Sequence, residues 1–300
     1  MMGWQRNGTA LCVRFLTVAL FLFSVELAAF TLSSDSKPSS PPNMSADELV
    51  RRVVANETQL VDSDHSHWIY RQHHVEDGKD TLKECVDTDQ GALCRLIAEG
   101  GHPLSQSEQA KEKERLAELV KNPERQRKLQ EARKKDGDQA LKMLKMLPNA
   151  FHYEYAGTEG DLVKLKFVPN PQFTPPDRES RVFHAMVGFM WVDRDAKRLV
   201  ELSGKLTRDV DFGFGLLGHL YRGGTFQVKR ADVGDGHWET TLLDVKIRGK
   251  ALFFKTINAD QRETTDNFAK APGKLTMAEG MKMLEVPNRS LQAKAASAAP

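Results

Sequence analysis

Two short motifs in the sequence match patterns used in phosphate chemistry. Residues 213–218 read G-x-G-x-x-G, as in dinucleotide-binding loops, and residues 211–213 read Asp-Phe-Gly, as in the magnesium loop of protein kinases. A dinucleotide loop needs a strand before it, a full helix after it and a parallel sheet around it. Gly223 and Gly224 would end such a helix within two turns, and no kinase catalytic loop accompanies Asp-Phe-Gly. We therefore interpret this segment as a turning loop and predict no cofactor.

The histidines and hydroxyl residues do not assemble a recognisable catalytic or metal site. His65 and His67 would share one face of a strand, and His73 and His74 follow, but no spacing selects a third ligand and H-E-x-x-H is absent. There is no G-x-S-x-G nucleophile elbow, and the carboxylate pairs fall at turns, where aspartate is a common turn former. The sequence predicts no metal site, no catalytic residues and a protein that is not an enzyme.

Residues 1–34 have the features of a signal peptide. Arg6 and Arg14 make the start positive, and residues 15–25 form an apolar run that Glu26 ends. A spanning helix needs about 20 predominantly apolar residues, so we expect an exported protein that is not an integral membrane protein. With 43 basic and 41 acidic residues, the chain as a whole lacks the large excess of positive charge that is typical of nucleic-acid-binding proteins.

In an exported protein, the two cysteines that follow this segment can form a disulfide. If Asp89 and Gln90 form a two-residue hairpin turn, the antiparallel register places Cys85 directly opposite Cys94, within reach of a disulfide. The alternatives are two buried thiols or a register slipped by one residue, which would put the side chains on opposite faces. Because exported proteins fold where disulfides persist, we predict a Cys85–Cys94 disulfide.

The elements that must position these residues begin after a Ser/Pro-rich linker at residues 35–44. Ser45 and Glu48 have capping-box spacing and predict a helix over residues 46–61. The composition of residues 288–300 predicts a disordered tail. A single domain is expected over residues 45–287.

A helical insertion is predicted at residues 105–147. Ser105 and Glu108 make a second capping box, and Gly137-Asp138 is expected to end one helix and cap the next. The segment thus predicts helices at 106–121, 123–136 and 139–147, the last closed by Pro148. Its charged surface lacks the aromatic residues that a nucleic-acid surface would interleave, so we interpret it as solvated.

Alternating apolar and polar residues predict strands from His67 to Ala98 and again from Phe151 onward. About ten strands follow at hairpin spacing with few helices between them, which favours an antiparallel sheet over a doubly wound parallel one. The expected fold class is α+β: a curved, incomplete antiparallel β-barrel packed around helices.

Aromatic side chains on these strands are candidates for an apolar cleft. Alternate residues share a face, and a helix about 10 Å wide is too narrow to cover many strands spaced at about 4.8 Å. The predicted cleft residues are Phe151, Tyr153, Tyr155, Phe189, Trp191 and Phe254, with Leu141, Leu144 and Leu147 nearby. The alternatives are that a ligand fills this cleft or that the insertion helices close it and the aromatics form a core.

Six segments between residues 90 and 260 resemble a known bacterial family. They are Cys94–Ser105, Phe167–Pro171, Gly188–Asp193, Asp209–Gly215, Tyr221–Phe226 and Gly249–Lys255. They are similar to exported proteins described as outer-membrane lipoprotein-sorting proteins, related in fold to the lipoprotein-localisation (LolA-type) carriers. The chain is longer than the small carriers and holds the additional segment at residues 105–147.

The resemblance implies a half-barrel whose hydrophobic hollow shields acyl chains, in a protein of the periplasm and cell envelope. It leads us to expect a non-enzymatic binding protein or carrier for a lipid or a lipoprotein acyl group. The expected partners are a lipid or an acylated protein, with an envelope protein as a further candidate. An envelope sensor or structural interaction module on the same fold is the alternative, followed by an exported hydrolase with an unrecognised site. Acyl-chain binding follows here from the fold analogy alone.

Overall fold

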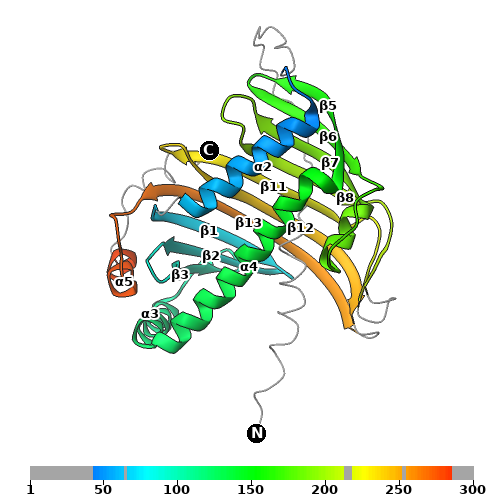
Figure 1. The fold of residues 1–300 in the computed structure, drawn as a ribbon. Coiled ribbons are helices and arrows are strands. Elements are labelled where there is room, and N and C mark those ends of the chain that lie inside the picture. Colours follow the sequence, from blue (N-terminus) through cyan, green and yellow to red (C-terminus); the bar gives the residue numbers. More distant parts are fainter. Residues whose placement is uncertain (1–42, 64–65, 213–217, 252–254, 286–300) are drawn as a thin grey trace, which may run out of the picture. The chain divides into compact units, whose positions relative to one another are not determined.

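The computed structural model describes residues 43–63, 66–212, 218–251 and 255–285 (Figure 1). The fold is α+β and contains an open, antiparallel 13-stranded sheet with strand order β4-β3-β2-β1-β13-β12-β11-β8-β7-β6-β5, to which β9 and β10 are attached through β12. The predicted fold class is confirmed, with more strands than the ten expected. The predicted signal peptide, the tail, Phe254 and most of the linker and of the glycine-rich loop lie outside the described residues.

The chain divides into two compact units. The first contains the chain up to Ser63 together with Asp136–Gln261, and the second contains Asp64–Lys135 together with the chain from Arg262 onward. The helix α4 (Pro123–Ala150) and the strand β13 (Lys255–Lys270) contribute to both. That residues 45–287 form a single domain stays a prediction.

The first unit is built mainly from hairpin-connected strands and one long helix. Its elements are α2 (Ala46–Ser63), β5 (Phe151–Glu159), β6 (Leu162–Pro169), the 3-10 helix η1 (Glu179–Ala185), β7 (Met186–Asp193), β8 (Leu199–Leu206), β9 (Val210–Phe212), β10 (Gly218–Leu220), β11 (Thr225–Gly234) and β12 (His237–Ala251). In the second unit lie β1 (Trp68–Glu76), β2 (Lys79–Val86), β3 (Leu93–Glu99), β4 (His102–Pro103), α3 (Gln106–Lys121) and α5 (Met277–Glu285).

The predicted break in the second insertion helix is wrong, because α4 runs without interruption from Pro123 to Ala150. Gly137 costs a helix only about 1 kcal/mol relative to alanine, so glycine alone does not end it. The residues after Gly137 keep a helical spacing of buried side chains at Met143, Leu147 and Ala150. Burial of this face outweighs the glycine penalty.

Helices cover one face of the sheet in the first unit, which we call the inner face. Figure 1 shows α2 lying across the strands β5 to β8. Leu49, Val50 and Val53 of α2 are at most 1% exposed and belong to one core cluster with Met143 and Leu147 of α4. The strands complete this cluster with Phe151, Val163, Leu165, Phe167, Met190, Val192, Phe226, Val245 and Ile247. Two helices therefore close the inner face with side chains.

A buried ion-pair network attaches α2 to the strands. Glu57 is 3% exposed, and its carboxylate accepts hydrogen bonds from Arg198 Nε at 2.8 Å, Arg198 Nη2 at 3.1 Å and the Leu199 backbone N–H at 3.0 Å. Arg230 Nη1 donates to the same carboxylate, and the Arg198 guanidinium lies 5.2 Å from the centroid of the Trp238 ring. Burial raises the pKa of Glu57, but the two arginines and the backbone donor outweigh it and hold that pKa below its usual range.

We expect Glu57→Gln to lower the free energy of unfolding by about 3–5 kcal/mol, because it leaves the buried guanidinium of Arg198 and the half-buried one of Arg230 without their counter-charge. Chemical denaturation at pH 7 measures this. Because the folded-state pKa of Glu57 is lowered, its contribution is present above the unfolded value of about 4.3 and is lost as the pH falls through the folded pKa. The difference between wild type and variant should therefore shrink in acid.

Glu131→Gln is the matched control, since Glu131 pairs with Arg127 on the exposed surface of α4, where both side chains are 68% exposed. An exposed pair contributes about 0–1 kcal/mol. Equal losses for Glu57→Gln and Glu131→Gln would contradict the role given to the buried network.

The second unit contains the predicted disulfide hairpin. Strands β2 and β3 pair Cys85 with Cys94 in register, and their sulfur atoms are bonded, with the Cα atoms 4.1 Å apart. Backbone hydrogen bonds in both directions between Thr88 and Gly91 close the turn around Asp89 and Gln90. The register predicted from the turn is confirmed. This hairpin packs on a second core cluster with α3 and α5, through Val86, Leu93, Leu116, Leu119, Met277 and Leu284.

Replacing both cysteines with serine should lower the free energy of unfolding by about 2–3 kcal/mol, as expected for release of a loop of this length from the unfolded chain. Thermal unfolding with and without dithiothreitol measures it. The reductant should lower the Tm of the wild type and leave the Tm of the double variant unchanged. A wild-type Tm that does not respond to full reduction would contradict the stabilising role of the bond.

Candidate functional site

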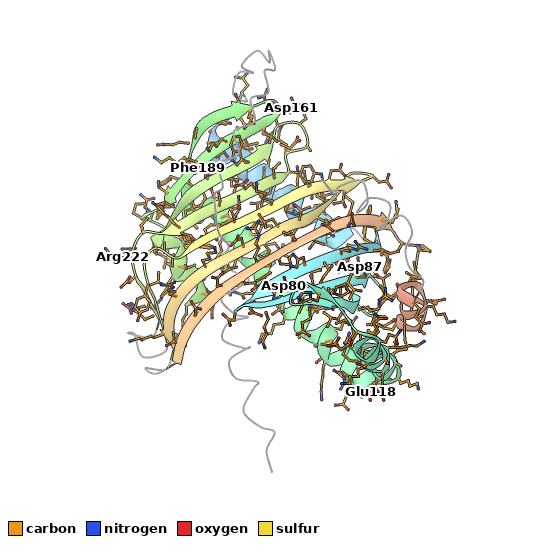
Figure 2. All side chains as sticks on the ribbon, turned by 180° about the vertical axis from the view of Figure 1, so that it is seen from behind. Asp80, Asp87, Glu118, Asp161, Phe189 and Arg222 are labelled. Carbon is orange, nitrogen blue, oxygen red and sulfur yellow. A yellow bond between two sulfur atoms is a disulfide. The ribbon has the colours of Figure 1, made fainter. Side chains whose placement is uncertain are left out.

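The face of the first unit opposite the helices, which we call the outer face, is identified by strand register. In β6 the side chains of Val163, Leu165 and Phe167 are buried in the inner core, so Lys164 and Lys166 point the other way. Strand pairing places Phe189 beside Lys166 and Trp191 beside Lys164. Phe189 and Trp191 therefore belong to the outer face. Figure 2 views this side, with α2 behind the strands, and labels Phe189.

The predicted cleft residues of β5 lie on the inner face instead. Phe151 is 2% exposed and Tyr153 is 6% exposed, within the core cluster. The Tyr153 hydroxyl donates to the Leu147 carbonyl at 3.0 Å, and burial raises its pKa. Tyr155 is partly buried against the same core and donates its hydroxyl to the Met44 carbonyl at 2.9 Å.

The sequence-based cleft therefore needs correction, because its residues do not line one cavity. Phe151, Tyr153 and Tyr155 pack under the helices, whereas Phe189 and Trp191 lie on the opposite face of the sheet. The insertion closes the inner face: Leu147 is buried in that core and Leu144 packs against it, while Leu141 is half-buried. Closure by helices was the alternative stated from the sequence.

An apolar groove of about 510 Å³ lies on the outer face, and we call it the Phe189 groove. Its lining consists of Lys166, Phe167, Val187, Gly188, Phe189, Ser203, Gly204, Lys205 and Thr225. Phe189 is 39% exposed and is one of three large apolar side chains exposed to at least 36% in the described part of the chain. Lys164 approaches it from the side, with Nζ 4.5 Å from the Phe189 ring centroid and 5.0 Å from that of Trp191.

Two facing glycines form part of the groove lining. Gly188 of β7 pairs with Gly204 of β8, and the rings of Phe167 and Phe226 pack against them from neighbouring strands. A Cβ atom on Gly188 would lie 2.0 Å from the Ser203 carbonyl oxygen and 2.7 Å from Phe167 Cζ. Only glycine permits this approach, so the one position of β7 between Val187 and Phe189 carries no side chain.

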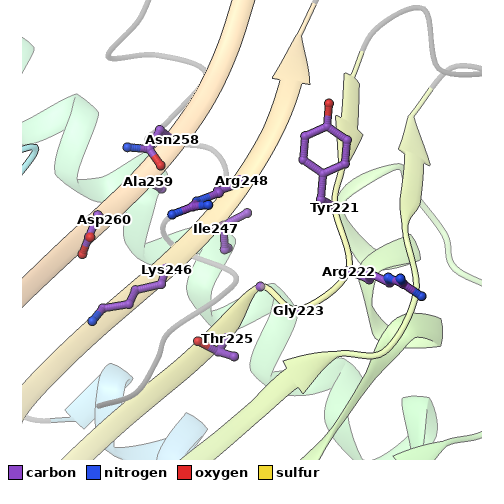
Figure 3. A pocket seen from close by; sticks show the side chains of 11 residues that line it. Tyr221, Arg222, Gly223, Thr225, Lys246, Ile247, Arg248, Asn258, Ala259 and Asp260 are labelled. Atoms are coloured by element: carbon purple, nitrogen blue, oxygen red, sulfur yellow. The ribbon is translucent and has the colours of Figure 1, made fainter.

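A second pocket of about 500 Å³, which we call the basic pocket, adjoins the groove (Figure 3). Its lining consists of Tyr221, Arg222, Gly223, Gly224, Thr225, Lys246, Ile247, Arg248, Asn258, Ala259 and Asp260. Thr225 lines both hollows. Strand register joins them in one cross-strand row, Val187, Lys205, Thr225 and Lys246. The groove and the basic pocket are thus neighbouring parts of one surface.

The turn at the edge of the basic pocket is held by an Asp-His-Asp cluster. Asp209 Oδ1 accepts the Arg222 backbone N–H at 2.7 Å, and Asp209 Oδ2 lies 3.2 Å from His219 Nε2. His219 Nδ1 lies 2.7 Å from Asp211 Oδ1, and the His219 ring meets Tyr221 edge-on at 4.9 Å. The hydrogen bond to Asp211 and the charges of both aspartates raise the pKa of His219.

Within the described ranges, no group of three or more histidine, cysteine or acidic side chains is placed to hold a metal ion. Among the described helices, none is long and apolar enough to cross a membrane.

Sequence reasoning missed the basic pocket, although one signal was present. Lys246, Arg248 and Lys250 alternate along β12, and with a strand's period of two they share a face. The buried Ile247 between them identifies that face as the outer one. The contribution of the turn at residues 221–224 depends on tertiary structure and has no comparable signal.

Comparison with known proteins yields no family assignment. No protein-family model matches the chain, and no curated protein matches it. Among solved structures, the crystal structure of a DUF1329 family protein from Desulfovibrio piger is similar over 75% of this chain and 95% of that chain, with 11% sequence identity and a TM-score of 0.22. Similarity at this level carries no functional argument.

We expect Asp211→Asn to lower the pKa of His219, because the variant removes the charge-assisted hydrogen bond to Nδ1. NMR titration of the imidazole signals measures this shift. Since the folded-state pKa is raised, the stability it contributes is present below the unfolded value of about 6.5 and is lost as the pH rises through the folded pKa. The destabilisation caused by Asp211→Asn should therefore be larger at pH 6 than at pH 9, and equal losses would contradict this.

Proposed function

We propose that the protein is a non-enzymatic binding protein or carrier for a ligand that bears an acyl chain, a lipid or an acylated protein. The observation that carries this proposal is the apolar Phe189 groove on the outer face of the first unit. Its volume of about 510 Å³ falls in the range of about 300–1,000 Å³ typical of small-molecule sites. The sequence resemblance to lipoprotein-sorting proteins supports the same class of ligand.

Exposed aromatic surface is concentrated where this ligand would lie. Within the described part of the chain, three large hydrophobic side chains are markedly exposed, and two of them, Phe189 and Tyr221, line the groove and the basic pocket. Exposed apolar side chains at a groove can mark a site for ligand binding. The ligand site proposed here differs from the sequence-based one, because the helices fill the inner face and leave the outer face open.

The proposal includes export to the periplasm of the cell envelope. The signal-peptide pattern of residues 1–34 supports export, and the Cys85–Cys94 bond is of the kind that persists in oxidising compartments.

It also assigns no catalytic step to the protein. Ser203 and Thr225 line the groove. Among the contacts of the described residues, neither hydroxyl is bonded to the histidine or carboxylate that would activate a nucleophile.

The groove is tested by Phe189→Asp, with binding of the fluorescent fatty acid 11-dansylaminoundecanoic acid as the readout. Removing an apolar ring and introducing a carboxylate should weaken binding at least about tenfold, since burial of such a side chain contributes about 1.5–3 kcal/mol. Leu129→Asp is the matched control, because Leu129 is 41% exposed on α4 and is not one of the residues that line the groove. Far-UV circular dichroism verifies that both variants fold.

Native mass spectrometry of protein purified without detergent provides an independent check, because a carrier should retain mass from acyl-containing molecules. Wild-type protein that neither retains such mass nor binds the fluorescent fatty acid would overturn the proposal and favour an interaction module. Release of free fatty acid from a bound ester, measured in the same experiment, would instead favour a hydrolase.

A further inference from the structure

We infer that the basic pocket binds the anionic head group of the acyl ligand, a phosphate or a carboxylate, while the chain lies in the Phe189 groove. This inference rests on the proposed function and specifies its ligand class: an anionic amphiphile rather than a neutral one.

The two hollows are arranged for one elongated ligand. They share Thr225, and the cross-strand row from Val187 through Lys205 and Thr225 to Lys246 passes from one to the other. Four neighbouring strands carry this row, so it spans about 14 Å at about 4.8 Å per strand step. A molecule with an apolar chain at one end and a polar group at the other could place its chain in the Phe189 groove and its polar group in the basic pocket.

The basic pocket carries an excess of positive charge. Arg222, Lys246 and Arg248 line it together with a single carboxylate, that of Asp260. In the part of the chain that the structure describes, none of these three cations forms a salt bridge, whereas the nearby Lys229 lies 3.5 Å from Glu201. Unpaired cations gathered in a pocket beside an apolar groove are complementary to a negatively charged head group.

The individual side chains supply suitable donors. Figure 3 shows Lys246 and Arg248 extending from the same side of β12 toward β13, which carries Asn258, whereas Arg222 extends from its turn in another direction. A guanidinium group matches the oxygen pairs of phosphate and carboxylate, and an ammonium group adds a point charge. We therefore assign the main contacts to Lys246 and Arg248.

The turn that borders the pocket is fixed before any ligand binds. The Asp209 carboxylate accepts a hydrogen bond from the Arg222 backbone N–H. The His219 ring lies between Asp209 and Asp211 and contacts both carboxylates. Asp209 is thereby engaged with the turn and with His219, and Asp211 with His219. A preorganised rim reduces the entropic cost of binding.

The test is isothermal titration calorimetry with three probes below their aggregation limits: 1-decanoyl lysophosphatidic acid, 1-decanoylglycerol and inorganic phosphate. The first two differ only by the phosphate group. The expected order of affinity is the lysophosphatidic acid, then the neutral glyceride, with inorganic phosphate weakest because it lacks the chain. Binding of the lysophosphatidic acid should also weaken as salt concentration rises.

The double variant Lys246→Gln/Arg248→Gln should weaken binding of the lysophosphatidic acid at least tenfold and change binding of the glyceride less than twofold. Lys145→Gln/Arg181→Gln is the matched control, which removes one lysine and one arginine that are exposed on α4 and η1 of the same unit. This control should bind both acyl probes as the wild type does.

The possible failures are distinguishable. Equal affinity of the wild type for the two acyl probes, or no effect of the double variant, would overturn the head-group inference and leave the acyl-binding function standing. Inorganic phosphate that binds as tightly as the lysophosphatidic acid would show a site for free anions and overturn the inference. No binding of either acyl probe would overturn the proposed function itself.

Discussion

The attachment of α2 to the strands is the constraint on which the first unit depends. An α-helix with a strongly apolar stripe must bury it, and Leu49, Val50 and Val53 do so against the inner face. Glu57, one turn further along, adds a directional contact through Arg198 and Arg230. Burying a carboxylate costs several kcal/mol unless its oxygens are satisfied, and here three donor groups satisfy them. The network thus selects one position of the helix, where apolar contacts alone would tolerate several.

Closing the inner face decides where binding chemistry remains. Side chains alternate between the two faces of a sheet. The helices therefore cover every second residue of a strand and leave the residues between them on the outer face. In β7 this leaves Phe189 and Trp191 outside, with Met190 and Val192 inside. The facing pair Gly188 and Gly204 lets Phe167 and Phe226 fill the inner side at the same level of the sheet. Inner packing and the outer groove are therefore two consequences of one strand arrangement.

The outer face combines features that separately have simple structural explanations. A partly exposed phenylalanine, alternating basic residues on one strand and a turn held by aspartates are each common on protein surfaces. Their proximity is the basis of the proposed function, because Thr225 lines both an apolar hollow and one that three cations line. The proposed anionic acyl ligand is the molecule whose chemistry requires both hollows at once.

Local patterns in the sequence determined much of the architecture. Capping boxes at Ser45 and Ser105, the hairpin register of Cys85 and Cys94 and the alternation of the strands depend on neighbours within a few residues, so they could be predicted. Tertiary structure alone decided which face of each strand the helices cover, because that choice depends on contacts such as Glu57 with Arg198, which are 141 residues apart. The same packing placed Phe151 in the inner core and left Phe189 on the outer face. A period of two shows that residues share a face of one strand, but only long-range packing energy determines whether that face becomes core or binding surface.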